Sequence, residues 1–261
     1  LDYYVEMIRR VKAILPEATV KAFTAIELSY MIRRAGLSLE EGLRRLREAG
    51  MEAIPGGGAE IFDEEIRARI CPDKGSTAEW LAVHEAAHRL GIKTNATILY
   101  GHIEGVEHRI DHLDRLRALQ DRTGGFNAFI PLKYRNYGNA MSEVGEVSVI
   151  EDLRMLAMSR IYLDNIPHVK AYWVMYGKAT TELALAFGAD DIDGTIDDTT
   201  KIYSMAGADD RRPRMTADEM RSLHAMIPGS AYHEIDSPFG HDGFLVEHEQ
   251  LNDILLPFMN N

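Results

Sequence analysis

The 261-residue sequence contains one cysteine, Cys71, and no apolar run long enough to cross a membrane. A single cysteine excludes a framework of internal disulfides and is typical of a protein from a reducing cytoplasm. The N-terminal segment lacks the apolar core of a signal peptide. Positive charge is also scarce, because 29 Lys and Arg stand against 41 Asp and Glu, a formal net charge of −12. This balance disfavours nucleic acid and anionic membranes as the main partner, and we expect a small-molecule ligand instead. The single cysteine leads us to expect a cytoplasmic protein.

Short strand-like runs alternate with amphipathic helical segments along residues 1–208. The runs expected to form strands are residues 19–24, 51–54, 93–100, 126–132, 168–175 and 189–192. This alternation favours parallel pairing through right-handed crossovers. We therefore predict an α/β fold, a TIM-type (β/α) barrel; since about six strands are visible, a closed eight-stranded barrel would lack its first two. Because Leu1 already lies inside a helical pattern, we expect the sequence to be a piece of something longer.

Three consecutive glycines, Gly56, Gly57 and Gly58, follow the strand predicted at residues 51–54, and Glu60 ends the loop. Glycine allows positive φ angles and lets a ligand approach the backbone closely. The stretch matches neither GxGxxG nor GxxxxGK[ST], so it is not a standard phosphate-binding loop. A ligand-binding mouth and a tight strand-to-helix turn both remain open interpretations.

In a (β/α) barrel the active site lies at the C-terminal ends of the strands. That rule selects Thr24, Glu27, Glu60, Thr97, Tyr100, His102, Lys133, Arg135, Tyr176, Asp191 and Asp193. His102 and Glu104 are candidates for an acid and a base, or for binding a carboxylate; a helix-capping acid beside a surface histidine is the alternative. Asp191 and Asp193 offer oxygen ligands without the spacing of an EF-hand, and a solvated acidic loop explains them equally well.

The sequence His84-Glu85-Ala86-Ala87-His88 fits the zinc-binding pattern HExxH. In a barrel this crossover helix lies outside, far from the mouth. A second histidine pair with the same spacing, His108 and His112, shows how easily the pattern arises here. We therefore expect solvated or half-buried helix histidines, and no metal site in this chain.

Several longer stretches resemble one family. They are PGGGAEIF at 55–62, ICPDK at 70–74, NATILYGHIE at 95–104, TGGFNAFIPLKYRN at 123–136, DNIPHVKAYW at 164–173 and the acidic stretch at 188–208. Over residues 1–215 the sequence looks like aminofutalosine synthase, a radical S-adenosylmethionine transferase of menaquinone biosynthesis. The resemblance implies a [4Fe-4S] cluster on a CxxxCxxC motif, and addition of the 5′-deoxyadenosyl radical of S-adenosylmethionine to 3-[(1-carboxyvinyl)oxy]benzoate. It also implies a low-potential electron donor such as flavodoxin or ferredoxin.

The resemblance assigns roles to the residues selected above. The S-adenosylmethionine side would comprise Gly56, Gly57, Gly58, Glu60, Asn95 and Thr97. The substrate side would comprise Glu27, Tyr100, Lys133, Arg135, Asp191 and Asp193, with His102 and Glu104 as the catalytic pair. A cluster needs three thiolates, and the sequence has only Cys71, so we expect no cluster and an inactive fragment when the chain is alone.

The C-terminal part resembles a different protein. After a charged connector at residues 209–219, residues 220–251 look like the end of homoserine O-acetyltransferase, an α/β-hydrolase. His241 matches the histidine of that family's triad, but the chain has no nucleophile elbow GxSxG for it to serve. We expect residues 220–261 to form a short α-β-α tail. An acyltransferase fragment and a non-catalytic barrel fragment remain as alternative functions.

Overall fold

The computed structural model describes residues 1–136, 138–194, 216–236 and 248–259. The chain divides into two compact units, Leu1–Asp193 and Gly194–Asn261. The boundary predicted at residue 208 therefore lies outside the described residues. In the part of the chain that is described, no helix is both long and apolar enough to cross a membrane.

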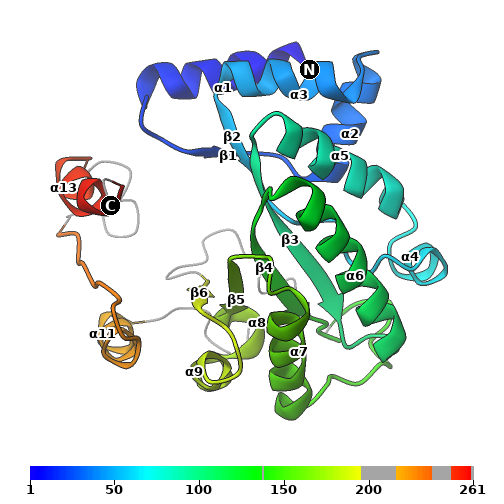
Figure 1. Cartoon of the computed structure of the whole chain (residues 1–261), viewed down its shortest axis with the longest axis vertical. Coiled ribbons are helices and arrows are strands. Elements are labelled where there is room, and N and C mark those ends of the chain that lie inside the picture. Colours follow the sequence, from blue (N-terminus) through cyan, green and yellow to red (C-terminus); the bar gives the residue numbers. More distant parts are fainter. Residues whose placement is uncertain (137, 195–215, 237–247, 260–261) are drawn as a thin grey trace. The chain divides into compact units, whose positions relative to one another are not determined.

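Six parallel strands form the centre of the first unit (Figure 1). They are β1 (Val20–Lys21), β2 (Met51–Ile54), β3 (Lys93–Tyr100), β4 (Phe126–Lys133), β5 (His168–Tyr172) and β6 (Asp191–Asp193). Each strand pairs with the next along the chain, in the order β1-β2-β3-β4-β5-β6. The predicted partial barrel is thus confirmed as a sheet of six consecutive parallel strands.

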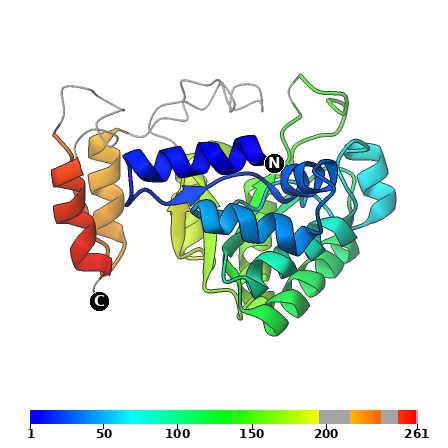
Figure 2. The same cartoon turned by 90° about the horizontal axis from the view of Figure 1, so that it is seen from above.

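Helices connect the strands and cover the outer face of the sheet (Figures 1 and 2). In the first unit they are α1 (Asp2–Ile14), α2 (Ala25–Arg34), α3 (Leu39–Ala49), α4 (Glu64–Ile70), α5 (Thr77–Arg89), α6 (Val106–Thr123), α7 (Val149–Tyr162), α8 (Trp173–Tyr176) and α9 (Lys178–Leu185). Local sequence sets several of their ends. Thr24 and Ser76 each form a capping box, and Gly50 and Gly124 end helices in the left-handed conformation.

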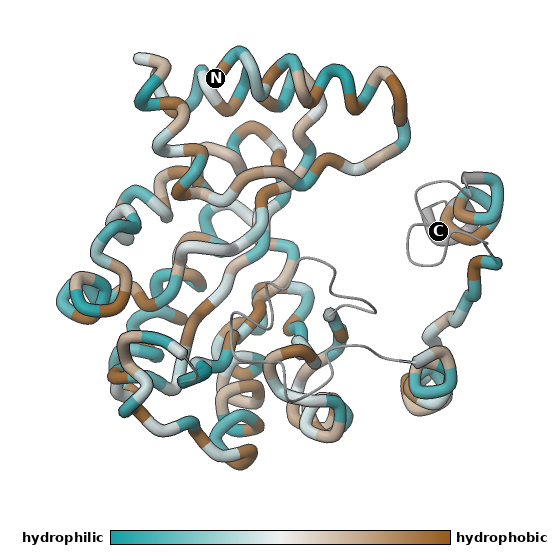
Figure 3. Tube along the Cα trace, turned by 180° about the vertical axis from the view of Figure 1, so that it is seen from behind, coloured by the Kyte–Doolittle hydropathy of each residue, from teal (hydrophilic) through white to brown (hydrophobic). Residues whose placement is uncertain are grey.

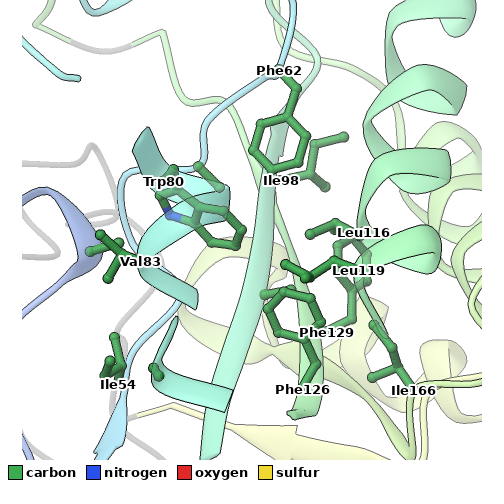
Figure 4. Close-up of a cluster of buried hydrophobic side chains, with 14 of the residues drawn as sticks. Ile54, Phe62, Trp80, Val83, Ile98, Leu116, Leu119, Phe126, Phe129 and Ile166 are labelled. Atoms are coloured by element: carbon green, nitrogen blue, oxygen red, sulfur yellow. The ribbon is translucent and has the colours of Figure 1, made fainter. Parts of the chain in front are cut away.

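The core lies between the sheet and its helices (Figure 4). Trp80 of α5 packs against Phe62 and Phe126, with ring centroids 5.3 and 6.1 Å apart. Leu116 and Leu119 of α6 are fully buried in the same cluster. Apolar and polar residues alternate along the helices, as expected where only one face is buried (Figure 3).

Three predicted strands differ from the structure. The first was expected over residues 19–24, but β1 comprises only Val20 and Lys21, and Thr24 is already the N-cap of α2. β5 was expected to continue to Met175, but it ends at Tyr172 and the chain turns into α8. The apolar run continues into α8, where Trp173, Val174 and Tyr176 are buried as helix residues; a short apolar run does not distinguish a strand from a buried helical turn. Residues 232–235 were expected to form a strand of the tail, yet they form none. Among the described residues, the second unit contains only helices α11 (Ala217–Met226) and α13 (His248–Met259), so that segment has no strand to pair with.

Candidate functional site

A cavity of about 410 Å³ lies beyond the C-terminal ends of β2, β3 and β4. Its lining comes from the loop after β2, the end of α4 with the turn that follows, and the segments at the ends of β3 and β4. The lining residues are Glu60, Arg69, Ile70, Cys71, Lys74, Leu99, Tyr134, Asn139, Ala140 and Met141. The volume is within the range of small-molecule sites. One carboxylate and two cations face a largely apolar wall, so the cavity suits a small ligand that carries charges of both signs.

Glu60 is the carboxylate of this cavity and has an unusual backbone. Its φ angle is +44°, in the left-handed region that residues other than glycine seldom occupy. Its carbonyl oxygen accepts a hydrogen bond of 2.8 Å from the backbone N–H of Leu99, which attaches the loop to β3. The carboxylate forms an ion pair with Lys74. Strain of this kind is often found at functional sites, where the surrounding structure holds it in place.

The three glycines before Glu60 make room for protein atoms. A Cβ on Gly56 would lie 2.9 Å from the carbonyl oxygen of Asn95 and 2.7 Å from the Thr97 methyl group. Gly58 has φ +89°, and a Cβ there would lie 2.5 Å from Ile26. A Cβ on Gly57 would lie 3.2 Å from Thr24, another protein contact. Packing alone thus accounts for these glycines, and their contact with a cofactor stays a prediction.

Asn95 and Thr97 belong to β3 and lie two residues apart, on one face of the strand. The opposite face carries Ala96 and Ile98, which are buried in the hydrophobic core. The Thr97 hydroxyl donates a 2.7 Å hydrogen bond to the Gly56 carbonyl. These two side chains therefore lie on the sheet face away from the core, beside the glycine loop. Their role as ligand-binding residues stays a prediction.

His102 and Glu104 form a closed, buried arrangement after β3. Glu104 accepts hydrogen bonds from the backbone N–H groups of Gly101 and His102, and from Arg109 Nε at 2.8 Å. His102 donates from Nε2 to the Leu99 carbonyl, at 3.0 Å, and its Nδ1 lies 3.1 Å from Glu104 without forming a hydrogen bond. Burial lowers the pKa of His102 more than Glu104 raises it. Both side chains have no exposed surface, so this pair is shielded from solvent.

Lys133 and Tyr100 were predicted to face the substrate, but they contact α7. Lys133 Nζ lies 2.9 Å from Asp152 Oδ2, and the Tyr100 hydroxyl donates to Asp152 Oδ1 at 2.7 Å. Lys133 and Asp152 are only 4% and 1% exposed. Burial and the neighbouring Tyr176 and Asp152 strongly raise the pKa of Tyr100, which keeps its hydroxyl protonated as a donor.

The remaining predicted substrate residues are dispersed. Arg135 lies 3.2 Å from Glu146, and the Glu27 carboxylate completes the capping box of α2. Asp191 and Asp193 both pair with Lys170 Nζ, at 2.9 and 3.4 Å. Among the described residues, the structure does not bring these groups into the cavity around Glu60. His241 lies outside the described residues.

Two functional candidates escaped the sequence analysis. Lys74 pairs with Glu60 across fourteen positions of the sequence. Arg67 looked like an ordinary residue of a short helix, yet it is 3% exposed and contacts the glycine loop. Nothing in the sequence of α4 indicates that Arg67 is buried. The glycine loop that it contacts comes close to it only when the chain folds.

The HExxH histidines bind protein hydroxyls. His84 Nδ1 and His88 Nε2 each lie 2.8 Å from the Thr94 hydroxyl, and His88 Nδ1 lies 2.7 Å from that of Thr123. Among the described residues, no group of three His, Cys, Asp or Glu side chains is placed to hold a metal ion. The expectation of solvated or half-buried histidines is wrong for this pair, because both are buried.

An iron–sulfur cluster does not fit the residues present. Such a cluster needs three thiolates, and Cys71 is the only cysteine of the sequence. Burial raises the pKa of the Cys71 thiol, which disfavours the thiolate form that binds metals.

Two family models match the chain: the radical SAM superfamily over residues 2–116, and the CofH/MqnC C-terminal region over residues 123–225. The chain is a radical SAM homologue. The second match continues past residue 220, where the hydrolase-like tail was predicted to begin. That second resemblance gains no support from these matches.

The curated relatives include enzymes of several reactions. An aminodeoxyfutalosine synthase from Thermus thermophilus is 47% identical over 210 residues, which are 79% of this chain and 56% of the relative. A 5-amino-6-(D-ribitylamino)uracil–L-tyrosine 4-hydroxyphenyl transferase from Methanothermobacter thermautotrophicus is 40% identical over 79% of this chain and 57% of its own. A cyclic dehypoxanthine futalosine synthase from Streptomyces coelicolor is 36% identical over 87% of this chain and 57% of the relative. The chain thus spans about half the length of the curated relatives it matches.

Among solved structures, methylornithine synthase superposes with a TM-score of 0.59 at 15% identity. The superposition covers 86% of this chain and 60% of that structure. This likeness concerns the fold alone, and it agrees with a partial TIM-type barrel.

Proposed function

We propose that the chain belongs to an aminodeoxyfutalosine synthase-like radical SAM transferase and forms its S-adenosylmethionine and substrate sites. The 47% identity to the Thermus thermophilus synthase carries this proposal. When bound, the cluster and S-adenosylmethionine supply a 5′-deoxyadenosyl radical, which in this reaction adds to 3-[(1-carboxyvinyl)oxy]benzoate. The chain by itself lacks the thiolates for the cluster, so we expect it to bind ligands without turnover. The electron donor of the whole enzyme would be a low-potential protein such as flavodoxin or ferredoxin.

The cavity around Glu60 suits the methionyl end of S-adenosylmethionine. That end carries an ammonium and a carboxylate, and the cavity offers the Glu60 carboxylate beside the cations of Lys74 and Arg69. The Glu60 side chain is 15% exposed, so it is desolvated enough for a charge-assisted hydrogen bond and still open to a ligand. In this arrangement Glu60 binds the ligand ammonium, and the two cations orient its carboxylate.

Isothermal titration calorimetry with S-adenosylmethionine tests the proposal. The chain should bind it, and Glu60→Gln should weaken binding about 10- to 100-fold, because a hydrogen bond to a charged group is lost. The control is Glu65→Gln, which removes an exposed carboxylate of α4 outside the cavity lining and should leave the affinity unchanged. Absence of any binding by the unaltered chain contradicts the proposal.

The choice of second substrate needs its own experiment, since the relatives act on different molecules. With S-adenosylmethionine bound, 3-[(1-carboxyvinyl)oxy]benzoate and dehypoxanthine futalosine are titrated separately. The synthase proposal expects the benzoate to bind more tightly. Preference for dehypoxanthine futalosine favours the cyclic dehypoxanthine futalosine synthase reaction of the 36% identical relative.

A further inference from the structure

Arg67 is a buried cation that binds backbone carbonyl groups. It projects from α4, and its guanidinium donates hydrogen bonds to the carbonyl oxygens of Gly58, Ala59, Ile61 and Gly75. In the described part of the chain, no carboxylate forms an ion pair with it. A buried charge is costly unless hydrogen bonds satisfy it. Here both terminal nitrogens of Arg67 donate to backbone carbonyls, while its buried Nε has no hydrogen-bond partner in the described part of the chain.

These carbonyls surround Glu60. Ala59 and Ile61 are its two neighbours in the chain, and both of their carbonyls accept from the same nitrogen, Nη1 of Arg67. The Glu60 carbonyl accepts from Leu99 on the other side of the loop. The backbone on both sides of the strained residue is therefore fixed, which is the condition for a non-glycine residue to keep φ at +44°.

Arg67 also joins two loops of the cavity. Its Nη2 atom reaches Gly58 of the glycine loop and Gly75 of the turn that carries Lys74. Lys74 is the ion-pair partner of Glu60. The same guanidinium thus contacts the segments that carry both charged groups, and among the described residues it forms no ion pair with the Glu60 carboxylate.

We propose that Arg67 is a positioning residue for cation recognition by Glu60, holding the loop so that the carboxylate enters the cavity and binds a ligand ammonium. This role rests on the proposed function, because the ligand considered is S-adenosylmethionine. Only the planar fork of a guanidinium spans carbonyls of two loops; a lysine ammonium is a compact charge that cannot do so.

The first test is a double-mutant cycle with Arg67→Lys and Glu60→Gln, measured by calorimetric titration with S-adenosylmethionine. Arg67→Lys keeps the charge and should still weaken binding about 10-fold or more, since it loses the fork. Because Arg67 acts through Glu60, the double variant should bind no more weakly than Glu60→Gln alone. Additive losses would show a general structural role and overturn the proposal. Arg89→Lys, at an exposed position of α5, is the matched control and should bind as the unaltered chain does.

A second readout does not depend on S-adenosylmethionine. Cys71 is the only thiol of the chain and lines the same cavity, so its alkylation by iodoacetamide reports on that wall. Arg67→Lys should release the Gly75 carbonyl and speed alkylation at fixed pH more than about two-fold, through local opening. An unchanged rate would overturn the role of Arg67 even if the ligand binds. The two proposals can fail separately. If the unaltered chain does not bind S-adenosylmethionine but Arg67→Lys speeds the alkylation of Cys71, the proposed function fails and the role of Arg67 in holding the loop stands. Arg67→Gln serves as the second variant if Arg67→Lys does not fold.

Discussion

Acidification between pH 7 and 5 should destabilise the fold through its buried histidines. Burial, together with Lys93, lowers the pKa of His88 to about 4, and burial lowers that of His112 to about 3. Both groups titrate near 6.5 when unfolded, so the unfolded chain takes up protons first as the pH falls. Stability is therefore greatest above pH 6.5 and is lost progressively below it, down to the folded-state pKa values.

The size of this loss of stability follows from the lowered pKa of His88. When the pH falls from 7 to 5, protonation of this one histidine in the unfolded state lowers the free energy of unfolding by about 2 kcal/mol. His112 adds a loss of about the same size, because its folded form also stays neutral across that range. The physical cause is that a charged imidazole would lose hydration. At His88 the protonated ring could also no longer accept a hydrogen bond, so the hydroxyls of Thr94 and Thr123 would both have to act as acceptors.

Urea unfolding at pH 7 and pH 5 measures this loss. His88→Gln keeps hydrogen-bonding groups but cannot titrate, so its drop in unfolding free energy should be smaller by about 2 kcal/mol. His224→Gln, a substitution in the second unit, should leave the drop unchanged. An equal drop in His88→Gln and the unaltered protein would refute the reasoning, because the acid sensitivity would then arise elsewhere.

Three further outcomes are expected. Lys133→Met should lower the free energy of unfolding by about 3–5 kcal/mol, since it leaves Asp152 buried without its cation, and a double Lys133→Met, Asp152→Leu variant should recover much of that loss in urea titrations. Gly56→Ala should lower the melting temperature, because its Cβ would lie 2.9 Å from the Asn95 carbonyl; an unchanged value would show that the loop shifts freely. Anaerobic reconstitution with iron and sulfide should give no iron–sulfur absorbance, and a stoichiometric [4Fe-4S] signal would contradict the thiolate argument based on the single cysteine, Cys71.

Much of the fold could be predicted from local patterns. The strands Met51–Ile54 and Lys93–Tyr100 form where the apolar runs predict them, and the capping box at Ser76 and the glycine at residue 124 set helix ends as expected. These features depend on groups a few residues apart, which the sequence displays directly. The end of β5 was missed because the apolar run continues into α8, and a short apolar run does not show whether its residues are buried in a strand or in a helical turn.

The candidate site was predicted less completely. Strand ends selected Glu60 correctly as a cavity residue, since the C-terminal ends of parallel strands meet on one side of a sheet. The same rule also selected Lys133 and Tyr100, whose side chains instead contact Asp152 of α7. The direction in which a residue at a strand end points depends on strand register and on the helix behind it, and neither is visible in a local pattern.

The sequence by itself determined the alternation of strands and helices, the shortage of cysteine, and a glycine loop that ends in one carboxylate. Only the tertiary structure decided what that loop contacts. It showed that Gly56 and Gly58 make room for β3 and α2, and that Arg67 fixes Glu60 by hydrogen bonds to the carbonyls around it. Backbone carbonyls carry no residue identity, so a contact between an arginine and a loop's main chain leaves no trace in the sequence and arises only when the chain folds.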